Sequence, residues 1–218
     1  MFVTFEGIDG CGKSTQARLL ADSLREAGHD VVLTREPGGS PGAEEIRALI
    51  LSGDTDKWSA MSELLLFNAA RRDHVERVIQ PALDAGKIVI SDRYLDSTRA
   101  YQAGRDPKMR LVVDQIHEAT IGLMPDVTLI MDIDPELAAR RCAARLGGMD
   151  RIEAKGMEFQ AKLHHAFREI IAAEPMRCMS INASASVEDI HGWVCAIMTC
   201  RFAQKRAPAT SHLDLELS

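Results

Sequence analysis

Near its N-terminus the chain reads Gly7-Ile8-Asp9-Gly10-Cys11-Gly12-Lys13-Ser14-Thr15. The spacing is that of a phosphate-binding loop, in which glycines turn successive backbone N–H groups toward phosphates. In such a loop Lys13 reaches the β- and γ-phosphates, and the hydroxyl of Ser14 binds Mg²⁺. The stretch therefore predicts a nucleoside triphosphate site that includes every residue from 7 to 15.

The residues on both sides of this loop support the prediction. The apolar run 2–5 is typical of a strand, and Ala17, Leu20 and Leu24 recur at helical spacing up to Gly28, a natural helix stop. The N-terminus of the following helix adds partial positive charge to the anion site. A chance glycine-rich turn would not have both flanks.

Composition narrows the remaining choices. With 218 residues, of which 46% are apolar, the chain can bury a substantial core, and we expect one domain. The net charge of −6 disfavours a general nucleic-acid binder, because such proteins release counterions through a basic surface. The few clustered arginines must therefore have local roles.

Cysteine usage and hydropathy predict a cytoplasmic protein without a membrane anchor. No C-x-x-C or Cys/His metal spacing occurs, so the odd number of cysteines suits a reducing compartment. No signal peptide and no apolar run of about 18 residues is present. The adjacent His164 and His165 diverge on a helix, which favours solvated or locally bonded side chains over metal ligands. The five cysteines are Cys11, Cys142, Cys178, Cys195 and Cys200.

Strands and helices are predicted to alternate along the chain. Further strands are expected at 31–34, 87–91, 127–131 and 176–181, and helices at 43–51, 58–84, 107–122, 136–145, 153–173 and 186–203. This alternation predicts an α/β fold with three layers, a five-stranded parallel sheet with helices on both faces. One domain then spans 1–203, followed by a tail at 204–218 with linker composition, for which disorder and local packing are equally compatible.

Ligands in such sheets bind at the carboxyl ends of the strands, where this chain is charged and glycine-rich. After the second strand, residues 35–39 read Arg-Glu-Pro-Gly-Gly, which marks a tight loop or an ordinary turn. After the third, Asp92 can hold Mg²⁺ and Arg93 can bind phosphate, although an isolated pair would fit a structural salt bridge. Asp132 and Asp134 compete for the metal role, but Asp134 precedes Pro135 and Glu136, so we interpret this pair as helix capping.

Together these motifs resemble those of the thymidylate kinase family. The resemblance runs in order over residues 2 to about 200, and its most specific parts are Thr34 to Gly39 and Asp92-Arg93-Tyr94. It implies a P-loop NTPase fold and transfer of the ATP γ-phosphoryl group to dTMP, giving dTDP and ADP, with Mg²⁺. The other segments that carry it are Leu66 to Arg71, Ser97 to Gln102 and Asp150 to Glu153.

The resemblance also implies which residues recognise the base and sugar of dTMP. Phe67 would stack on thymine and Arg71 would donate to the base, chemistry that suits both side chains. A core phenylalanine remains an alternative for Phe67, and packing against a neighbouring helix remains one for Tyr101. Tyr101 would otherwise crowd the ribose 2′ position. The implied substrate-binding set is completed by Pro37, Ser97, Thr98 and Gln102.

Charged residues are assigned to the acceptor phosphate in the same way. Asp9 would reach the sugar 3′-hydroxyl, and Arg47 and Arg93 would bind the phosphate. Glu36 would lie near that phosphate and the metal, which makes Ser14, Asp92 and Glu36 the implied metal set. Arg47 has the weakest case, because a solvated arginine is usual on a helix.

Residues 141–153 resemble the lid of the family. Paired glycines give it hinge freedom, and its arginines supply the charge that a cover over a triphosphate needs. Gly10, where other members carry arginine, fits the bacterial type, in which the catalytic arginine lies in the lid. We expect Arg145 and Arg151 in that role, and the solvated face of a helix for Arg140 and Arg141.

Other functions remain open from sequence. A kinase of another nucleotide or of a deoxynucleoside shares the loop, and so does a nucleotide switch or ATPase that binds partners. The absence of an added interaction domain and the arginines of the lid favour transfer. The resemblance further implies a homodimer, with helix 58–84 as a candidate contact, and no nucleic-acid partner.

Overall fold

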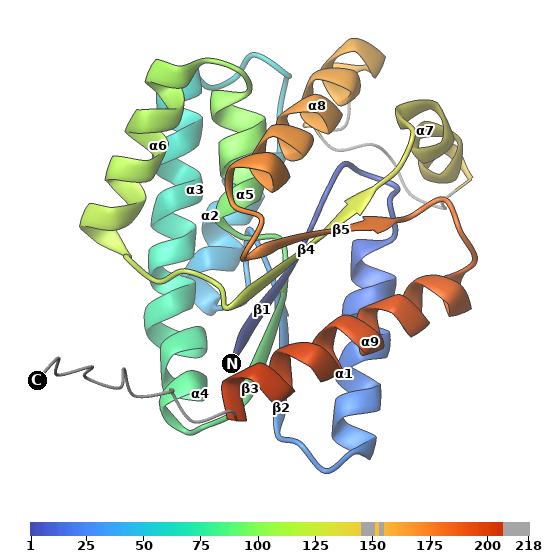
Figure 1. Cartoon of the computed structure of the whole chain (residues 1–218). Helices are drawn as coiled ribbons and strands as arrows, with labels where there is room; N and C mark the ends of the chain where they lie inside the picture. Colours follow the sequence, from blue (N-terminus) through green and yellow to red (C-terminus); the bar gives the residue numbers. More distant parts are fainter. Residues whose placement is uncertain (145–150, 153–154, 207–218) are drawn as a thin grey trace, which may run out of the picture.

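A five-stranded parallel sheet forms the centre of the molecule (Figure 1). The computed structural model describes residues 1–144, 151–152 and 155–206. The strand order is β2-β3-β1-β4-β5, and every neighbouring pair is parallel. This confirms the predicted α/β sheet. The strands are β1 (Phe2–Glu6), β2 (Val31–Arg35), β3 (Ile88–Asp92), β4 (Val127–Asp132) and β5 (Cys178–Asn182).

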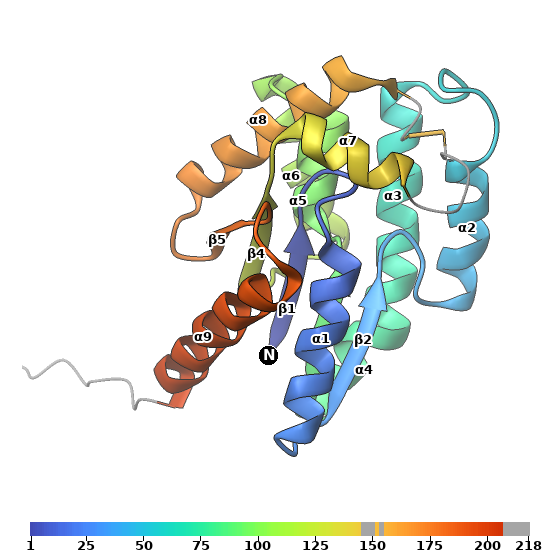
Figure 2. The ribbon, with the colours of Figure 1, turned by 90° about the vertical axis from the view of Figure 1, so that its right-hand side faces the viewer.

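Helices cover both faces of the sheet. Figures 1 and 2 show α1 and α9 side by side on one face, while α3, α4 and α6 lie on the other. The helix α8 packs on β4 and β5. The helical segments are α1 (Lys13–Glu26), α2 (Pro41–Leu51), α3 (Ala60–His74), η1 (Val75–Ile79), α4 (Gln80–Asp84), α5 (Leu95–Thr98), η2 (Arg99–Ala103), α6 (Pro107–Thr120), α7 (Pro135–Ala143), α8 (Met157–Ala173) and α9 (Val187–Arg206).

The alternation of side chains along β1 explains the two layers of helices. Phe2 packs in a cluster with Leu64 of α3 and Val113 of α6, whereas Val3 and Phe5 pack in a second cluster with residues of α1 and α9. Successive side chains of a strand point to opposite faces, so one strand supplies both cores. Because β1 is buried along its whole length, it holds the loop that follows it in a fixed place.

Two helical predictions differ from the structure. The helix predicted at 58–84 is interrupted by η1, a π-helical turn just before Pro81, and the N–H of Gln80 bonds to Val75. Proline has no N–H and crowds the preceding turn, and a wider turn accommodates this. The short segments α5 and η2 were not predicted, because nine residues split between two helix types carry too little periodicity to read.

The ends of the chain and the lid are only partly described. The last helix continues to Arg206, beyond its predicted end at 203. The predicted tail from 207 onward lies outside the described residues, as do 145–150 and 153–154 of the predicted lid. In the part of the chain that the structure describes, no helix is both long and apolar enough to cross a membrane. All five cysteines are free thiols.

Candidate functional site

A cavity of about 820 Å³ opens at the carboxyl ends of β1, β2 and β3. The sheet register sets Asp92 level with Phe5 of β1 and Arg35 of β2, so the segments that follow these strands meet there. Most of the predicted site residues line this cavity. They are Asp9, Gly10, Cys11, Gly12, Lys13, Ser14, Thr15, Glu36, Pro37, Arg47, Phe67, Arg71, Asp92, Arg93, Ser97, Thr98, Tyr101 and Gln102.

The loop between β1 and α1 forms one end of the cavity. Lys13 is buried, and its ammonium group donates to the carbonyl of Ile8 at 2.8 Å, which folds its side chain back over the loop. Figure 2 shows α7 lying over this loop. A Cβ on Gly10, whose φ is +79°, would come within 2.3 Å of the Ala138 carbonyl of α7. The position therefore leaves no room for a side chain. Gly7 and Ile8 support the loop but are not among the described residues that line the cavity.

Ser14 and Asp92 lie together beside this loop. The Ser14 hydroxyl bonds to Oδ2 of Asp92, while Oδ1 of Asp92 is buried without a partner among the described residues. An unpartnered carboxylate oxygen next to a hydroxyl is a fitting donor set for Mg²⁺, which takes one or two protein oxygens together with substrate phosphates. Within the described residues no group of three or more His, Cys, Asp or Glu side chains is placed to hold a metal.

Asp9, Arg93 and Tyr101 form a second polar group in the cavity lining. The guanidinium of Arg93 pairs with Asp9, and the Tyr101 hydroxyl donates to the other oxygen of Asp9 at 3.0 Å. Burial alone would raise the pKa of Asp9, but the charges of Arg93 and Lys13 outweigh it and lower this pKa. Asp9 is thus an ionised acceptor. Tyr101 also packs edge-on against Phe159 of α8, which agrees with the packing alternative, and it lines the cavity as the sugar role would require.

The backbone of Arg93 is held in an unusual conformation. Its φ is +73°, and no other described non-glycine residue has a positive φ. The Arg93 N–H donates to Phe5 at 2.9 Å, the Ser91 hydroxyl donates to the Arg93 carbonyl at 2.8 Å, and the next N–H, of Tyr94, donates to Glu6 at 2.7 Å. Such conformations cost free energy and persist only where neighbours fix them. The three bonds therefore aim the Arg93 side chain into the cavity.

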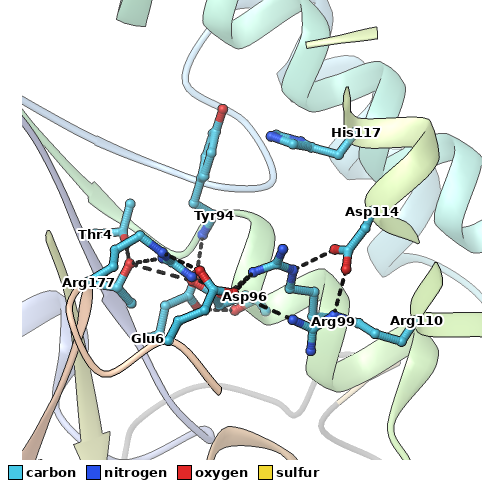
Figure 3. Close-up of polar contacts among 12 residues, drawn as sticks. Thr4, Glu6, Tyr94, Asp96, Arg99, Arg110, Asp114, His117 and Arg177 are labelled. Atoms are coloured by element: carbon cyan, nitrogen blue, oxygen red, sulfur yellow. Dashed lines mark hydrogen bonds and ion pairs between the residues drawn. The ribbon is translucent and has the colours of Figure 1, made fainter. Parts of the chain in front are cut away.

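Glu6 and Asp96 belong to a buried ionic network beneath the cavity (Figure 3). Asp96 pairs with Arg99 at 2.9 Å and Arg177 at 2.7 Å, which keeps its pKa low despite burial. Burial and the nearby Asp96 raise the pKa of Glu6 to about 8. Glu6 also accepts from the Ser97 hydroxyl at 2.5 Å, and Arg93 donates to the same hydroxyl at 3.0 Å. The predicted Ser97 thus links Arg93 to this network.

Arg71 and Glu36 form a buried ion pair at the opposite wall. Arg71 donates through Nε to Glu36 at 2.7 Å and through Nη2 to Thr98 at 2.8 Å. Its Nη1 is buried without a partner among the described residues. The half-buried Phe67 lies one helical turn before Arg71 on α3, and its side chain faces the same cavity. An aromatic ring beside an unsatisfied donor is suited to a base that has a carbonyl edge.

Glu36 has less freedom than the prediction of a metal ligand requires. Its second oxygen contacts Nδ1 of His74 at 3.1 Å, so both oxygens are engaged by side chains. Burial alone would raise the pKa of Glu36, but Arg71 and His74 outweigh it and lower this pKa. Glu36 therefore holds Arg71, whereas Asp92 retains an oxygen without a partner among the described residues.

Arg151, predicted as a catalytic lid residue, lies elsewhere. Its guanidinium donates to the carbonyls of Ile50 at 2.8 Å and Thr55 at 2.9 Å and pairs with Glu63. It is fully buried and is not among the described residues that line the cavity. In this structure Arg151 anchors its part of the predicted lid to α2, α3 and the segment between them, because its buried guanidinium is fully engaged by protein groups. Arg145 lies outside the described residues.

The remaining polar predictions have mixed outcomes. Asp134 caps α7 as expected, whereas Asp132 does not cap a helix and instead contacts His164 at 2.5 Å. His165 bonds to Glu169 within α8 and is locally bonded as expected, whereas the partner of His164 lies on another element, β4. Arg140 is exposed as expected, but the prediction for Arg141 is wrong. Arg141 donates to the carbonyl of Ala183 at 2.8 Å and lines the cavity, because α7 turns it toward the sheet.

The segment that follows β5 forms a wall of the cavity that was not predicted from the sequence. Gln16 of α1 donates to the carbonyl of Val187 at 2.9 Å and so joins the phosphate loop to this wall. The segment has mostly small side chains where it lines the cavity and carries no motif, so only its position after a strand pointed to it. The missed lining residues are Gln16, Arg35, Leu51, Tyr94, Arg141, Cys142, Ile152, Ala185, Ser186, Val187 and Ile190. Arg47 lines the opposite end and donates to Pro37 at 2.6 Å.

Known proteins resemble the chain over nearly its whole length. A family profile described as thymidylate kinase matches residues 5–194. The chain belongs to the thymidylate kinase family. A thymidylate kinase of Ruegeria pomeroyi is 52% identical over 94% of this chain and 98% of its own length, and one of Dinoroseobacter shibae is 52% identical over 90% and 95%.

The fold agrees with a solved structure of the same family. The crystal structure of thymidylate kinase from Ehrlichia chaffeensis has a TM-score of 0.74 and 37% identity, covering 91% of this chain and 98% of that one. The thymidylate kinase family also accounts for the phosphate loop and for the acceptor motifs together. A nucleotide switch or a partner-binding ATPase is not favoured by these matches.

Proposed function

We propose that this chain transfers the γ-phosphoryl group of ATP to dTMP, giving dTDP and ADP. The carrying observation is that a phosphate loop, the aromatic ring and guanidinium of Phe67 and Arg71, and the Asp9–Arg93 pair all line one cavity. Family membership and the names of the relatives support ATP as donor and dTMP as acceptor.

The acceptor needs no general base. A phosphate monoester has a second pKa of about 6, so dTMP is largely a dianion near neutral pH. An oxygen of the acceptor phosphate forms a bond to the γ-phosphorus, and the bond from that phosphorus to the β–γ bridging oxygen breaks, which leaves ADP. Catalysis then consists of holding both partners in line and neutralising the spreading charge.

The residues of the chain divide this work. Lys13 and the N–H groups at the start of α1 bind the donor phosphates, and Arg93, fixed by its backbone bonds, binds the phosphate of the acceptor. Asp9 orients Arg93 and offers an acceptor to the sugar 3′-hydroxyl. Tyr101 holds Asp9 and limits space beside the ribose. Arg47 completes the acceptor-phosphate side, and Arg141, in the wall, is a cation available to the donor.

A magnesium ion, when bound, would neutralise charge on the donor phosphates and hold them in place. Ser14 and Asp92 are the residues that would hold it, since the unpartnered oxygen of Asp92 fits a cation. Glu36 contributes by holding Arg71 for the base rather than as a ligand.

The same proposal extends to assembly and location. Met61 and Leu65 expose apolar surface on α3, which supports a homodimer that uses this helix. Five free thiols support a reducing, cytoplasmic location. Sedimentation that shows only monomer at micromolar concentrations would remove the dimer.

A coupled assay of ADP release across dTMP, dUMP, dCMP, AMP and thymidine tests the proposal. We expect release to depend on dTMP and to be much slower with AMP, dCMP and thymidine. Preference for another acceptor would identify a different kinase. Release that does not depend on any acceptor would identify an ATPase.

A further inference from the structure

Gln102 reaches the cavity with one end of its amide already engaged. Its Nε2 donates to Oε1 of Glu63 at 2.9 Å, while its Oε1 is buried without a partner among the described residues. The same cavity is lined by Phe67 and Arg71. A buried carbonyl oxygen that lacks a donor is costly, so a ligand that supplies an N–H would gain from it.

Glu63 cannot change this arrangement by donating a proton. Its side chain is 6% exposed, its second oxygen pairs with Arg151, and the ammonium of Lys155 lies 3.5 Å from its first. Burial alone would raise the pKa of Glu63, but the bonds from Arg151 and Gln102 outweigh it and lower this pKa. An ionised carboxylate only accepts hydrogen bonds, whereas the two ends of an amide are a donor and an acceptor of similar shape. Glu63 therefore decides which end of Gln102 is engaged and which end remains.

The remaining groups match one kind of pyrimidine. Arg71 carries only donors, including the unpartnered Nη1, and Gln102 retains only an acceptor. Thymine and uracil have an O4 acceptor next to an N3–H donor, which complements this pair. Cytosine has the reverse, an N4–H₂ donor next to an N3 acceptor, and would face like groups at both positions.

We propose that Glu63 is a positioning residue that sets the preference of the acceptor site for N3–H pyrimidines over cytosine, by fixing the amide of Gln102. The inference rests on the proposed function, since it concerns the base of the same acceptor. It also gives Arg151 and Lys155 a role, because they hold Glu63 rather than the donor phosphates.

The test compares Glu63→Gln with Glu63→Asp. Both variants disturb packing, but aspartate remains an acceptor-only group, whereas glutamine also donates and allows the Gln102 amide to turn. The ratio of kcat/KM for dTMP to that for dCMP is measured for each variant and for wild type. We expect Glu63→Gln to lower this ratio about tenfold, with the KM for ATP unchanged, and Glu63→Asp to retain most of it.

A double-mutant cycle shows whether Glu63 acts through Gln102. Gln102→Met should lower the same ratio, and adding Glu63→Gln to it should lower the ratio no further. If Glu63 were only structural, Glu63→Asp and Glu63→Gln would each lower kcat/KM for dTMP and for dCMP by the same factor. The double variant would then have a lower kcat/KM than Gln102→Met for both acceptors. Either result would overturn the inference.

A second variant covers failure of Glu63→Gln to fold, which thermal unfolding would reveal. Arg151→Met removes the cation that holds Glu63 and should lower the dTMP/dCMP ratio, whereas a catalytic Arg151 would lower kcat equally for both acceptors. If the folded Arg151→Met and Glu63→Gln variants keep the wild-type dTMP/dCMP ratio, the inference about Glu63 is wrong, but the proposed function is not affected. If wild type forms no dTDP, the proposed function fails first, and this separate result is visible before any variant is made.

Discussion

The two ends of the cavity are built in different ways. The donor end is one continuous stretch, residues 7–15, whose backbone N–H groups and Lys13 follow directly after a buried strand. The acceptor end is assembled from side chains that are far apart in the sequence, with Phe67 and Arg71 on α3, Gln102 on η2 and Arg93 after β3. A site made of backbone is encoded locally, whereas a site made of side chains depends on how helices pack.

The largest expected effect falls on the donor end. Lys13→Ala should lower kcat by about 10³, because a buried cation aimed at the donor phosphates acts mainly on the transition state. Steady-state kinetics at saturating ATP and dTMP measure the loss, and circular dichroism should show an unchanged fold. Lys108→Ala, on the exposed side of α6, is the matched control and should keep wild-type activity. Substantial turnover by Lys13→Ala would remove the donor assignment.

Arg93 lies between the two ends, so its loss tests whether they work together. Arg93→Ala should lower kcat by about 10² to 10³ and also raise the KM for dTMP, since Arg93 lines the cavity and is proposed to bind the acceptor phosphate that attacks the donor. Arg140→Ala, on an exposed helix face, is the control. A change confined to the KM for ATP would place Arg93 at the donor end alone.

A substitution at the acceptor end should weaken the binding of dTMP and leave turnover nearly unchanged. Phe67→Ala should raise the KM for dTMP about tenfold, because stacking of a base on an aromatic ring contributes about 1–3 kcal/mol. The kcat and the KM for ATP should change little. Leu111→Ala on the exposed side of α6 serves as control. Equal dTMP affinity in both variants would support the alternative of Phe67 as a core residue.

The buried network beneath the cavity should have the smallest effect on turnover, and its effect should appear in stability instead. Burial and Asp96 raise the pKa of Glu6 from 4.5 to about 8. Between these values the folded chain holds a proton that the unfolded chain has released, so the free energy of unfolding should fall as the pH rises from about 5 to about 8. Glu6→Gln should flatten this decline. Urea unfolding of both proteins across this range measures it, and parallel pH curves would contradict the raised pKa.

The same contrast explains what the sequence predicted. The parallel sheet follows from alternating strands and helices, and the donor loop from its spacing, so both could be predicted, whereas the strand order was found only in the structure. The roles of Arg151 and Arg141 could not, because they depend on whether a guanidinium meets carbonyl groups of another helix or the open cavity. The wall after β5 was missed because small apolar residues such as Ala185 carry no chemical signature.

Glu63 illustrates the same limit at the acceptor end. In sequence it is an acid in the first turn of a helix, which any solvated helix would carry. Its role can be recognised only in the folded chain, where Arg151 and Gln102, from distant segments, contact its carboxylate. Base preference is therefore a property of the packed molecule, even where the residues that touch the base can be predicted.

The central claim is that the γ-phosphoryl group passes from ATP at the donor end of the cavity to dTMP at the acceptor end, and this transfer can be followed directly. The wild-type chain is incubated with Mg²⁺, dTMP and ATP labelled at the γ-phosphate, and the products are separated. We predict that the label appears in dTDP, in equal amount to the ADP formed, with little inorganic phosphate. Label released as inorganic phosphate, with dTMP unchanged, would contradict the account.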